Sequence, residues 1–133
     1  MIKIIFADYD NMKNEMLVKQ LKMLKERHKC KLILFDGPMV DGEGTKASWC
    51  TENRPGMYDD YCFSYGGKNL VGTMLAYCEE SEIEATEAMF VSDNVAERNV
   101  AKEKGMEVRS PKAMAEAYKQ AVARLAQGLD LGK

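Results

Sequence analysis

The chain has 133 residues, of which 46% are hydrophobic and 30% are charged, a balance typical of one globular domain. Its net charge of −2 provides no broad basic field for non-specific binding to nucleic acid. No apolar run reaches the roughly 18 residues that a membrane helix needs, so we expect no membrane partner and a cytoplasmic location.

The sequence holds four cysteines and a single histidine, His28. The cysteines are spaced too irregularly for a zinc or redox site, and His28 lies in a charged helix end. We therefore expect reduced cysteines, and we expect no mechanism that depends on a Ser-His-Asp or Cys-His arrangement.

Strand and helix patterns alternate along the whole chain. Apolar runs predict five short strands, at 2–7, 31–35, 61–65, 89–92 and 106–108. Leucines at helical spacing predict a helix after the first strand, and the other predicted helices lie at about 70–78, 95–104 and 111–127. Ser110 and Pro111 favour the start of the last helix, and Gly128 is expected to end it.

This alternation predicts an α/β fold, a single Rossmann-like domain with a mostly parallel five-stranded sheet and helices on both faces. The domain is expected to span residues 1–128, and residues 129–133 form a tail. A long irregular stretch at 37–60, rich in Gly, Asp and Pro, takes the place of a large cap domain. Right-handed connections bring the carboxyl ends of all strands to one edge, where such sheets bind ligands.

The first predicted strand is followed by Asp8-Tyr9-Asp10-Asn11. Two carboxylates so close to a buried strand are unfavourable unless a positive charge neutralises them, and a hard divalent cation does this well. Capping of the following helix by Asp10 or Asn11 explains the same residues without a metal.

A second acid follows the fourth strand, at Ser92-Asp93, and Glu97 comes four residues later. Two acids at strand ends on the same edge of a sheet can share a metal ion. Gly66-Gly67-Lys68 lies between them in the sequence, after the third strand, where a lysine can reach a phosphate. A solvated lysine beside a glycine turn is the alternative for Lys68.

These motifs resemble those of the haloacid dehalogenase (HAD) superfamily. Asp8-Tyr9-Asp10-Asn11 is similar to its first motif, Gly67-Lys68 to its lysine motif, and the run from Glu87 to Val108 to its last motif. The resemblance implies a phosphatase in which Asp8 attacks phosphorus and forms an aspartyl-phosphate. Asp10 would act as acid and base, and Lys68 would stabilise the phosphoryl oxygens. The implied cofactor is Mg²⁺, held by Asp8, Asp10, Asp93 and Glu97.

One departure from this family concerns the end of the second strand, Leu34-Phe35-Asp36-Gly37, where HAD phosphatases have Ser or Thr. Thr45 or Ser48 would have to supply that hydroxyl. Asn94 is a further candidate residue of the site. The same departure resembles PIN-like nucleases of the NYN type. Under that resemblance Asp8, Asp36 and Asp93 hold Mg²⁺ for attack on RNA and Asn11 assists, although Asn69 stands where those nucleases have an acid.

The expected substrate is a phosphorylated small molecule, a nucleotide or the end of a nucleic acid. An open site without a large cap suits a bulky substrate, or a homo-oligomer in which one subunit covers the site of its neighbour. A catalytically degenerate binding domain is the third alternative.

Overall fold

The computed structural model of the chain describes residues 1–8, 12–38, 52–64 and 70–131. Its strands are all parallel and form one sheet in the order β3-β2-β1-β4-β5. They are β1 (Ile4–Asp8), β2 (Lys31–Pro38), β3 (Asp60–Ser64), β4 (Ala88–Val91) and β5 (Glu107–Arg109). The predicted α/β fold with a parallel sheet in a single Rossmann-like domain is confirmed.

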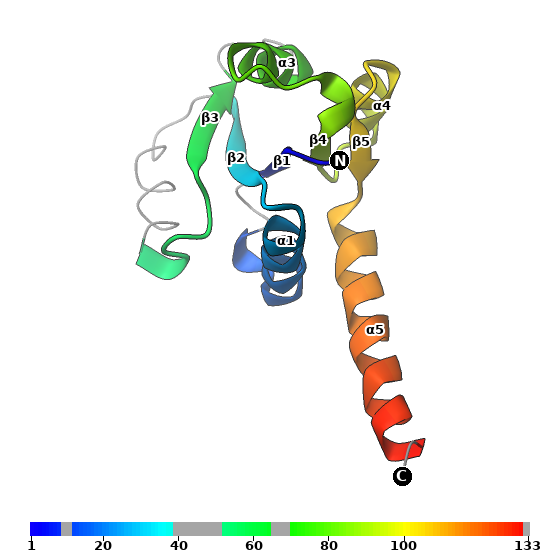
Figure 1. Cartoon of the computed structure of the whole chain (residues 1–133). Helices are drawn as coiled ribbons and strands as arrows, with labels where there is room; N and C mark the ends of the chain where they lie inside the picture. The colour runs from blue at the N-terminus through cyan, green and yellow to red at the C-terminus, as the bar shows by residue number, and fades with distance from the viewer. Residues whose placement is uncertain (9–11, 39–51, 65–69, 132–133) are drawn as a thin grey trace.

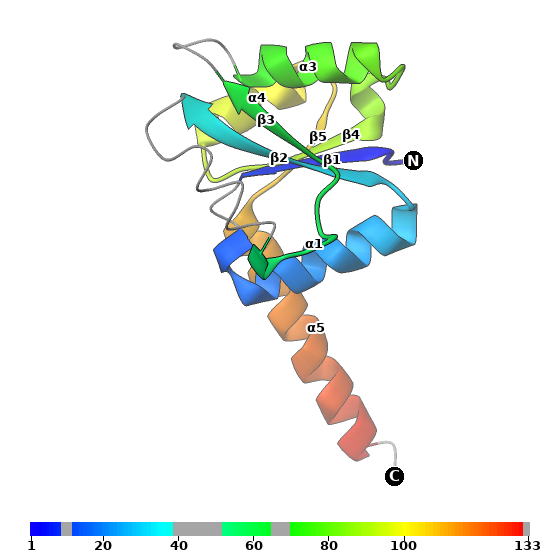
Figure 2. The ribbon, with the colours of Figure 1, turned by 90° about the vertical axis from the view of Figure 1, so that its left-hand side faces the viewer.

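Helices cover both faces of the sheet (Figures 1 and 2). The helices α1 (Glu15–His28) and α5 (Pro111–Leu131) lie on one face, and α3 (Leu70–Glu80) and α4 (Val95–Glu103) lie on the other. A short 3-10 turn, Ala85–Glu87, leads into β4.

The core has two layers because side chains of a strand alternate between the faces of the sheet. On β1, Ile5 and Ala7 pack with Leu17 and Leu21 of α1, whereas Ile4 and Phe6 belong to the cluster that includes α3 and α4. All four of these β1 side chains are fully buried, and Asp8 is the first residue of the strand that reaches solvent. The apolar run therefore ends where the carboxylate begins.

The start of α1 decides one of the alternatives left open by the sequence. Asn14 caps this helix, because its side-chain oxygen accepts hydrogen bonds from the backbone amides of Met16 (3.1 Å) and Leu17 (3.2 Å). Capping by Asp10 or Asn11 was therefore wrong. The helix begins later than those two residues, which lie outside the described part of the chain.

At the other end of α1, Lys29 adopts the left-handed conformation with φ 51° and ψ 44°. This position of a helix usually holds glycine, because a side chain with a Cβ atom is strained there. Lys29 is therefore a residue whose backbone conformation costs free energy.

Replacing Lys29 by glycine is expected to raise the free energy of unfolding by about 1 kcal/mol, because it relieves this strain. Thermal unfolding followed by circular dichroism would show a melting temperature higher by a few degrees. Lys29→Ala is the matched control, since it removes the same charge but keeps the Cβ atom. Equal stabilisation by alanine would contradict the explanation.

Two predicted boundaries were wrong. The helix α5 does not end at Gly128 but continues to Leu131, and β2 continues past Phe35 to Pro38, into the stretch expected to be irregular. The apolar stripe expected along the last helix is only partly used. Met114 is buried, whereas Val122 and Leu125 remain 47% and 67% exposed on the half of α5 that extends beyond the sheet (Figure 1).

None of the helices within the described ranges is both long enough and apolar enough to cross a membrane.

Candidate functional site

The strand order reverses direction between β1 and β4. From β1 the chain proceeds outward to β2 and β3, and β4 then starts the other half of the sheet on the opposite side of β1. Ligands of open α/β sheets bind at the carboxyl ends of the strands that flank such a switch point. These two ends carry Asp8 and the Ser92-Asp93 pair.

The register of the sheet brings Asp8 and Asp93 to neighbouring positions. Ala7 of β1 pairs with Val91 of β4, so Asp8 lies level with Ser92, and Asp93 follows one residue later. Adjacent strands are separated by roughly 4.8 Å. Asp8 is half-buried and Asp93 is exposed. The two strand-end acids expected to share a metal ion thus come from adjacent strands of the same edge.

The turn that carries Asp93 is held by hydrogen bonds on both sides of that residue. The buried Ser92 hydroxyl accepts a hydrogen bond from the Asn94 amide at 3.1 Å, and Asn94 Oδ1 accepts one from the Glu97 amide at 3.0 Å. The Arg98 guanidinium donates to the Ser92 carbonyl oxygen. Asn94 is therefore the N-cap of α4, and this turn has a defined conformation.

Arg98 was missed by the sequence reasoning. Its position in the second turn of a helix that follows a strand-end acid was the only available signal, and that signal is weak. The structure shows that Arg98 connects α4 back to the carboxyl end of β4.

Glu97 lies in the first turn of α4, close behind this turn. Burial raises the pKa of the Glu97 carboxyl above its ordinary value, because desolvation disfavours the charged form. A cation bound nearby would favour the ionised form and offset this cost.

Asp93 also lines a cavity of about 480 Å³, which leaves space beside the strand ends. The other lining residues come from the start of α1 and from the first turns of α5, and they are Asn14, Met16, Pro111, Lys112, Ala115, Glu116 and Lys119. Asp8 does not line this cavity. A cavity of this size accommodates a small organic molecule.

Several predicted site residues cannot be placed. Asp36 lies in β2, one position beyond Phe35, which pairs with Asp8, but only its backbone is described. The other predicted site residues outside the described part of the chain are Asp10, Asn11, Thr45, Ser48 and Lys68.

Among the described residues no three His, Cys, Asp or Glu side chains are gathered to hold a metal ion. Mg²⁺ is commonly held by one or two protein carboxylates together with water and substrate oxygens. Asp8 and Asp93 provide two carboxylates on adjacent strands, which matches that number of protein ligands.

No protein-family model matches the sequence, and no curated protein matches it significantly. Solved structures do share its fold. The core domain of a candidate phosphoglycolate phosphatase from Streptococcus pneumoniae superposes with a TM-score of 0.63 at 8% identity, covering 83% of this chain and 80% of that chain. A HAD family enzyme from Bacteroides thetaiotaomicron, in complex with magnesium and inorganic phosphate, gives 0.54 at 15% identity, with 83% and 94% covered.

A third structure is the N-terminal part of a Bacteroides fragilis protein that contains a phosphatase domain complexed with Mg²⁺. It gives a TM-score of 0.60 at 15% identity and covers 82% of this chain but only 36% of that chain. The chain shares its α/β fold with these three structures. At such low identities the likeness extends to the fold alone, and a fold by itself does not specify an activity.

Proposed function

We propose that this chain is a Mg²⁺-dependent phosphoester hydrolase in which Asp8 is the nucleophile. The observation that carries this proposal is the position of Asp8 and Asp93 at the two strand ends that flank the switch point of a HAD-like sheet. Both acids lie where ligands of such sheets bind, and the rigid turn around Asp93 gives one of them a fixed position.

In the proposed reaction a carboxylate oxygen of Asp8 attacks the phosphorus atom, and the bond from phosphorus to the leaving oxygen breaks. Asp10 donates a proton to that oxygen. Asp10 then takes a proton from a water molecule, which attacks the aspartyl-phosphate and releases inorganic phosphate with recovery of the Asp8 carboxylate. The net reaction is hydrolysis of one phosphoester bond.

The remaining residues would bind Mg²⁺ or contact the negatively charged phosphoryl oxygens. Asp8, Asp93 and the Asp10 backbone carbonyl would bind Mg²⁺, and Glu97 would support that site. Bound Mg²⁺ would neutralise negative charge on the phosphoryl oxygens. Lys68, which precedes α3 in the sequence, would contact the same oxygens, and the cavity beside Asp93 would accept part of the substrate.

A metal-dependent ribonuclease is the second candidate, and the position of Asp36 favours it. The strands β2, β1 and β4 are adjacent in the sheet, so Asp36, Asp8 and Asp93 lie near the carboxyl ends of three neighbouring strands. Three acids in a row suit a nuclease site in which water is the nucleophile, whereas a carboxylate at position 36 would repel a phosphate in a phosphatase.

Substituting Asp36 by serine separates the two candidates, because they predict opposite results. In the phosphatase, Asp36→Ser supplies the hydroxyl that HAD enzymes use, and hydrolysis of p-nitrophenyl phosphate is expected to be unchanged or faster. In the nuclease, the change removes a metal ligand, and cleavage of a labelled single-stranded RNA is expected to be lost. Both assays are run on one preparation, with and without Mg²⁺.

A further inference from the structure

A second cavity, of about 450 Å³, lies between α1 and the segment that precedes β3. Four of its lining side chains are cationic, namely Lys22, Lys25, Lys29 and Arg54, and Glu26 is the one acid among them. The other lining residues are small or apolar, and they are Val18, Cys30, Pro55, Gly56 and Met57. Cys30 and Met57 belong to the buried core, so the floor of this cavity is apolar and its rim is charged.

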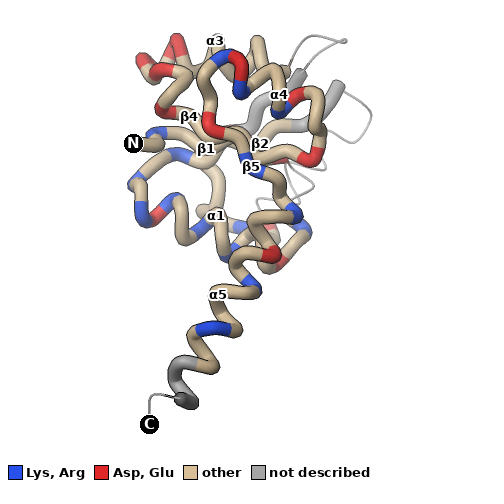
Figure 3. Tube along the Cα trace, turned by 90° about the vertical axis from the view of Figure 1, so that its right-hand side faces the viewer, with Lys and Arg blue, Asp and Glu red and all other residues tan. Residues whose placement is uncertain are grey.

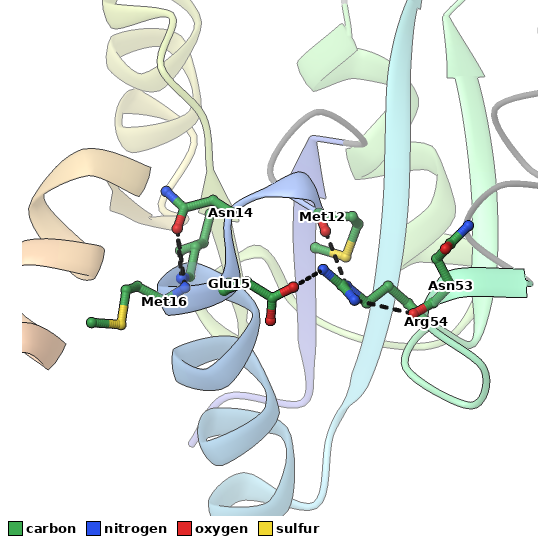
Figure 4. A network of polar contacts seen from close by, with 7 residues as sticks. Met12, Asn14, Glu15, Met16, Asn53 and Arg54 are labelled. Carbon is green, nitrogen blue, oxygen red and sulfur yellow. Dashed lines mark hydrogen bonds and ion pairs between the residues drawn. The ribbon is translucent and has the colours of Figure 1, made fainter.

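Two of the four cations are held in place by contacts within the protein. Arg54 donates to the Met12 carbonyl oxygen at 3.1 Å and pairs with Glu15 at 2.7 Å (Figure 4). Lys25 donates to the Met57 carbonyl oxygen at 3.1 Å and pairs with Asp59 at 3.0 Å. These contacts hold the two walls of the cavity together. One wall is α1, and the other is the segment that precedes β3.

The other two cations form no ion pair with the described residues. Lys22 lies on α1, Lys29 follows this helix as its C-cap, and both side chains line the cavity. The pair is therefore suited to a ligand with two or more negative groups.

Two further observations favour a ligand site over a row of solvated lysines. Lys29 occupies a left-handed position that glycine would fill without strain, and strained residues are often retained at functional sites. Basic residues are also concentrated on this helix and directly beside it in the sequence. Between Lys13 and Lys31 there are seven Lys or Arg residues and two Glu residues, in a chain whose net charge is −2 (Figure 3).

We propose that this cavity binds a nucleotide unit with two or more phosphates, either free or as part of a single strand. Lys22 and Lys29 would contact successive phosphates, and the sugar and base would cover the apolar floor around Val18 and Met57. Glu26 would repel a phosphate at this rim, but its carboxylate can accept a hydrogen bond from the amino group of a base. A purely inorganic polyanion would not use the floor or Glu26.

Isothermal titration calorimetry in EDTA tests the proposal without hydrolysis, and the probes are ADP, adenosine, pyrophosphate and a four-nucleotide deoxyadenosine strand. Either ADP or the strand is expected to bind roughly tenfold or more tightly than both adenosine and pyrophosphate, because only these two engage the rim and the floor together. Tighter binding of ADP identifies a free nucleotide as the ligand, and tighter binding of the strand identifies a single-stranded nucleic acid.

The variant Lys22→Gln/Lys29→Gln is expected to weaken binding by roughly tenfold or more. Lys19→Gln/Lys31→Gln is the matched control, because it removes the same charge from two exposed residues that do not line the cavity. The proposal is overturned if the control weakens binding equally, if pyrophosphate binds as tightly as the tighter of the two nucleotide probes, or if neither nucleotide probe binds. Since these measurements need no catalysis, they also hold for Asp8→Asn and do not depend on the phosphohydrolase proposal.

Discussion

Substituting Asp8 by asparagine is expected to lower kcat for p-nitrophenyl phosphate by roughly 10³-fold or more, with the fold intact. Asparagine has nearly the same shape but is not a nucleophile and lacks the charge that a metal ion requires, so the loss exceeds that of one stabilising donor, roughly 10²–10³. EDTA is expected to abolish the wild-type activity as well, and added Mg²⁺ to restore it.

Far-ultraviolet circular dichroism and the melting temperature would show that Asp8→Asn is folded. Glu103→Gln is a suitable control, because it makes the same change of charge at an exposed residue of α4, away from the strand ends. Full activity of Asp8→Asn, or of the wild type in EDTA, would contradict the proposal of a metal site at the carboxyl edge of the sheet.

Substituting Lys68 by methionine is expected to lower kcat by about 10²–10⁴, while the melting temperature stays nearly constant. In the phosphatase proposal Lys68 supplies a positive charge that contacts the phosphoryl group, most strongly in the transition state. Removing that charge therefore affects kcat more than substrate affinity.

A phosphoryl mimic provides a readout of Lys68 that does not depend on turnover. Beryllium fluoride with Mg²⁺ is expected to form a stable adduct on Asp8 in the wild type and a weaker adduct in Lys68→Met. Lys102→Met serves as the control, since Lys102 is an exposed residue of α4. Wild-type turnover together with an unchanged adduct in Lys68→Met would rule out the HAD mechanism and leave the nuclease or a binding domain.

The parts of the fold that follow from local periodicity were predictable. The strands β1 and β4 are buried on both faces and therefore form short continuous apolar runs, and α4 stops before Gly105, which adopts φ 97°. The neighbouring positions of Asp8 and Asp93 were also predictable, because parallel strands align their carboxyl ends.

The errors arose where pairing between distant segments overrides local signals. Asp36-Gly37-Pro38 has the composition of a turn, yet pairing with β3 keeps this segment in the sheet, with a register shift between Asp36 and Pro38. The cavity beside α1 was equally unpredictable from the sequence. Arg54 reaches it from a loop far along the chain, and no periodic pattern indicates such a contact.

The central position of β1 has a consequence for the order in which the sheet and the site form during folding. Its two neighbours are β2, which follows after one helix, and β4, which pairs with it only after β2, β3 and α3 have been passed in the chain. Closing this long-range contact costs more entropy than closing the local ones, and it is the contact that brings Asp93 to Asp8. A nascent chain that has completed only β1, β2 and β3 would hold Asp8 without its partner acid. The edge would become competent for chemistry only when the second half of the sheet docks, so an incompletely folded chain would stay inactive.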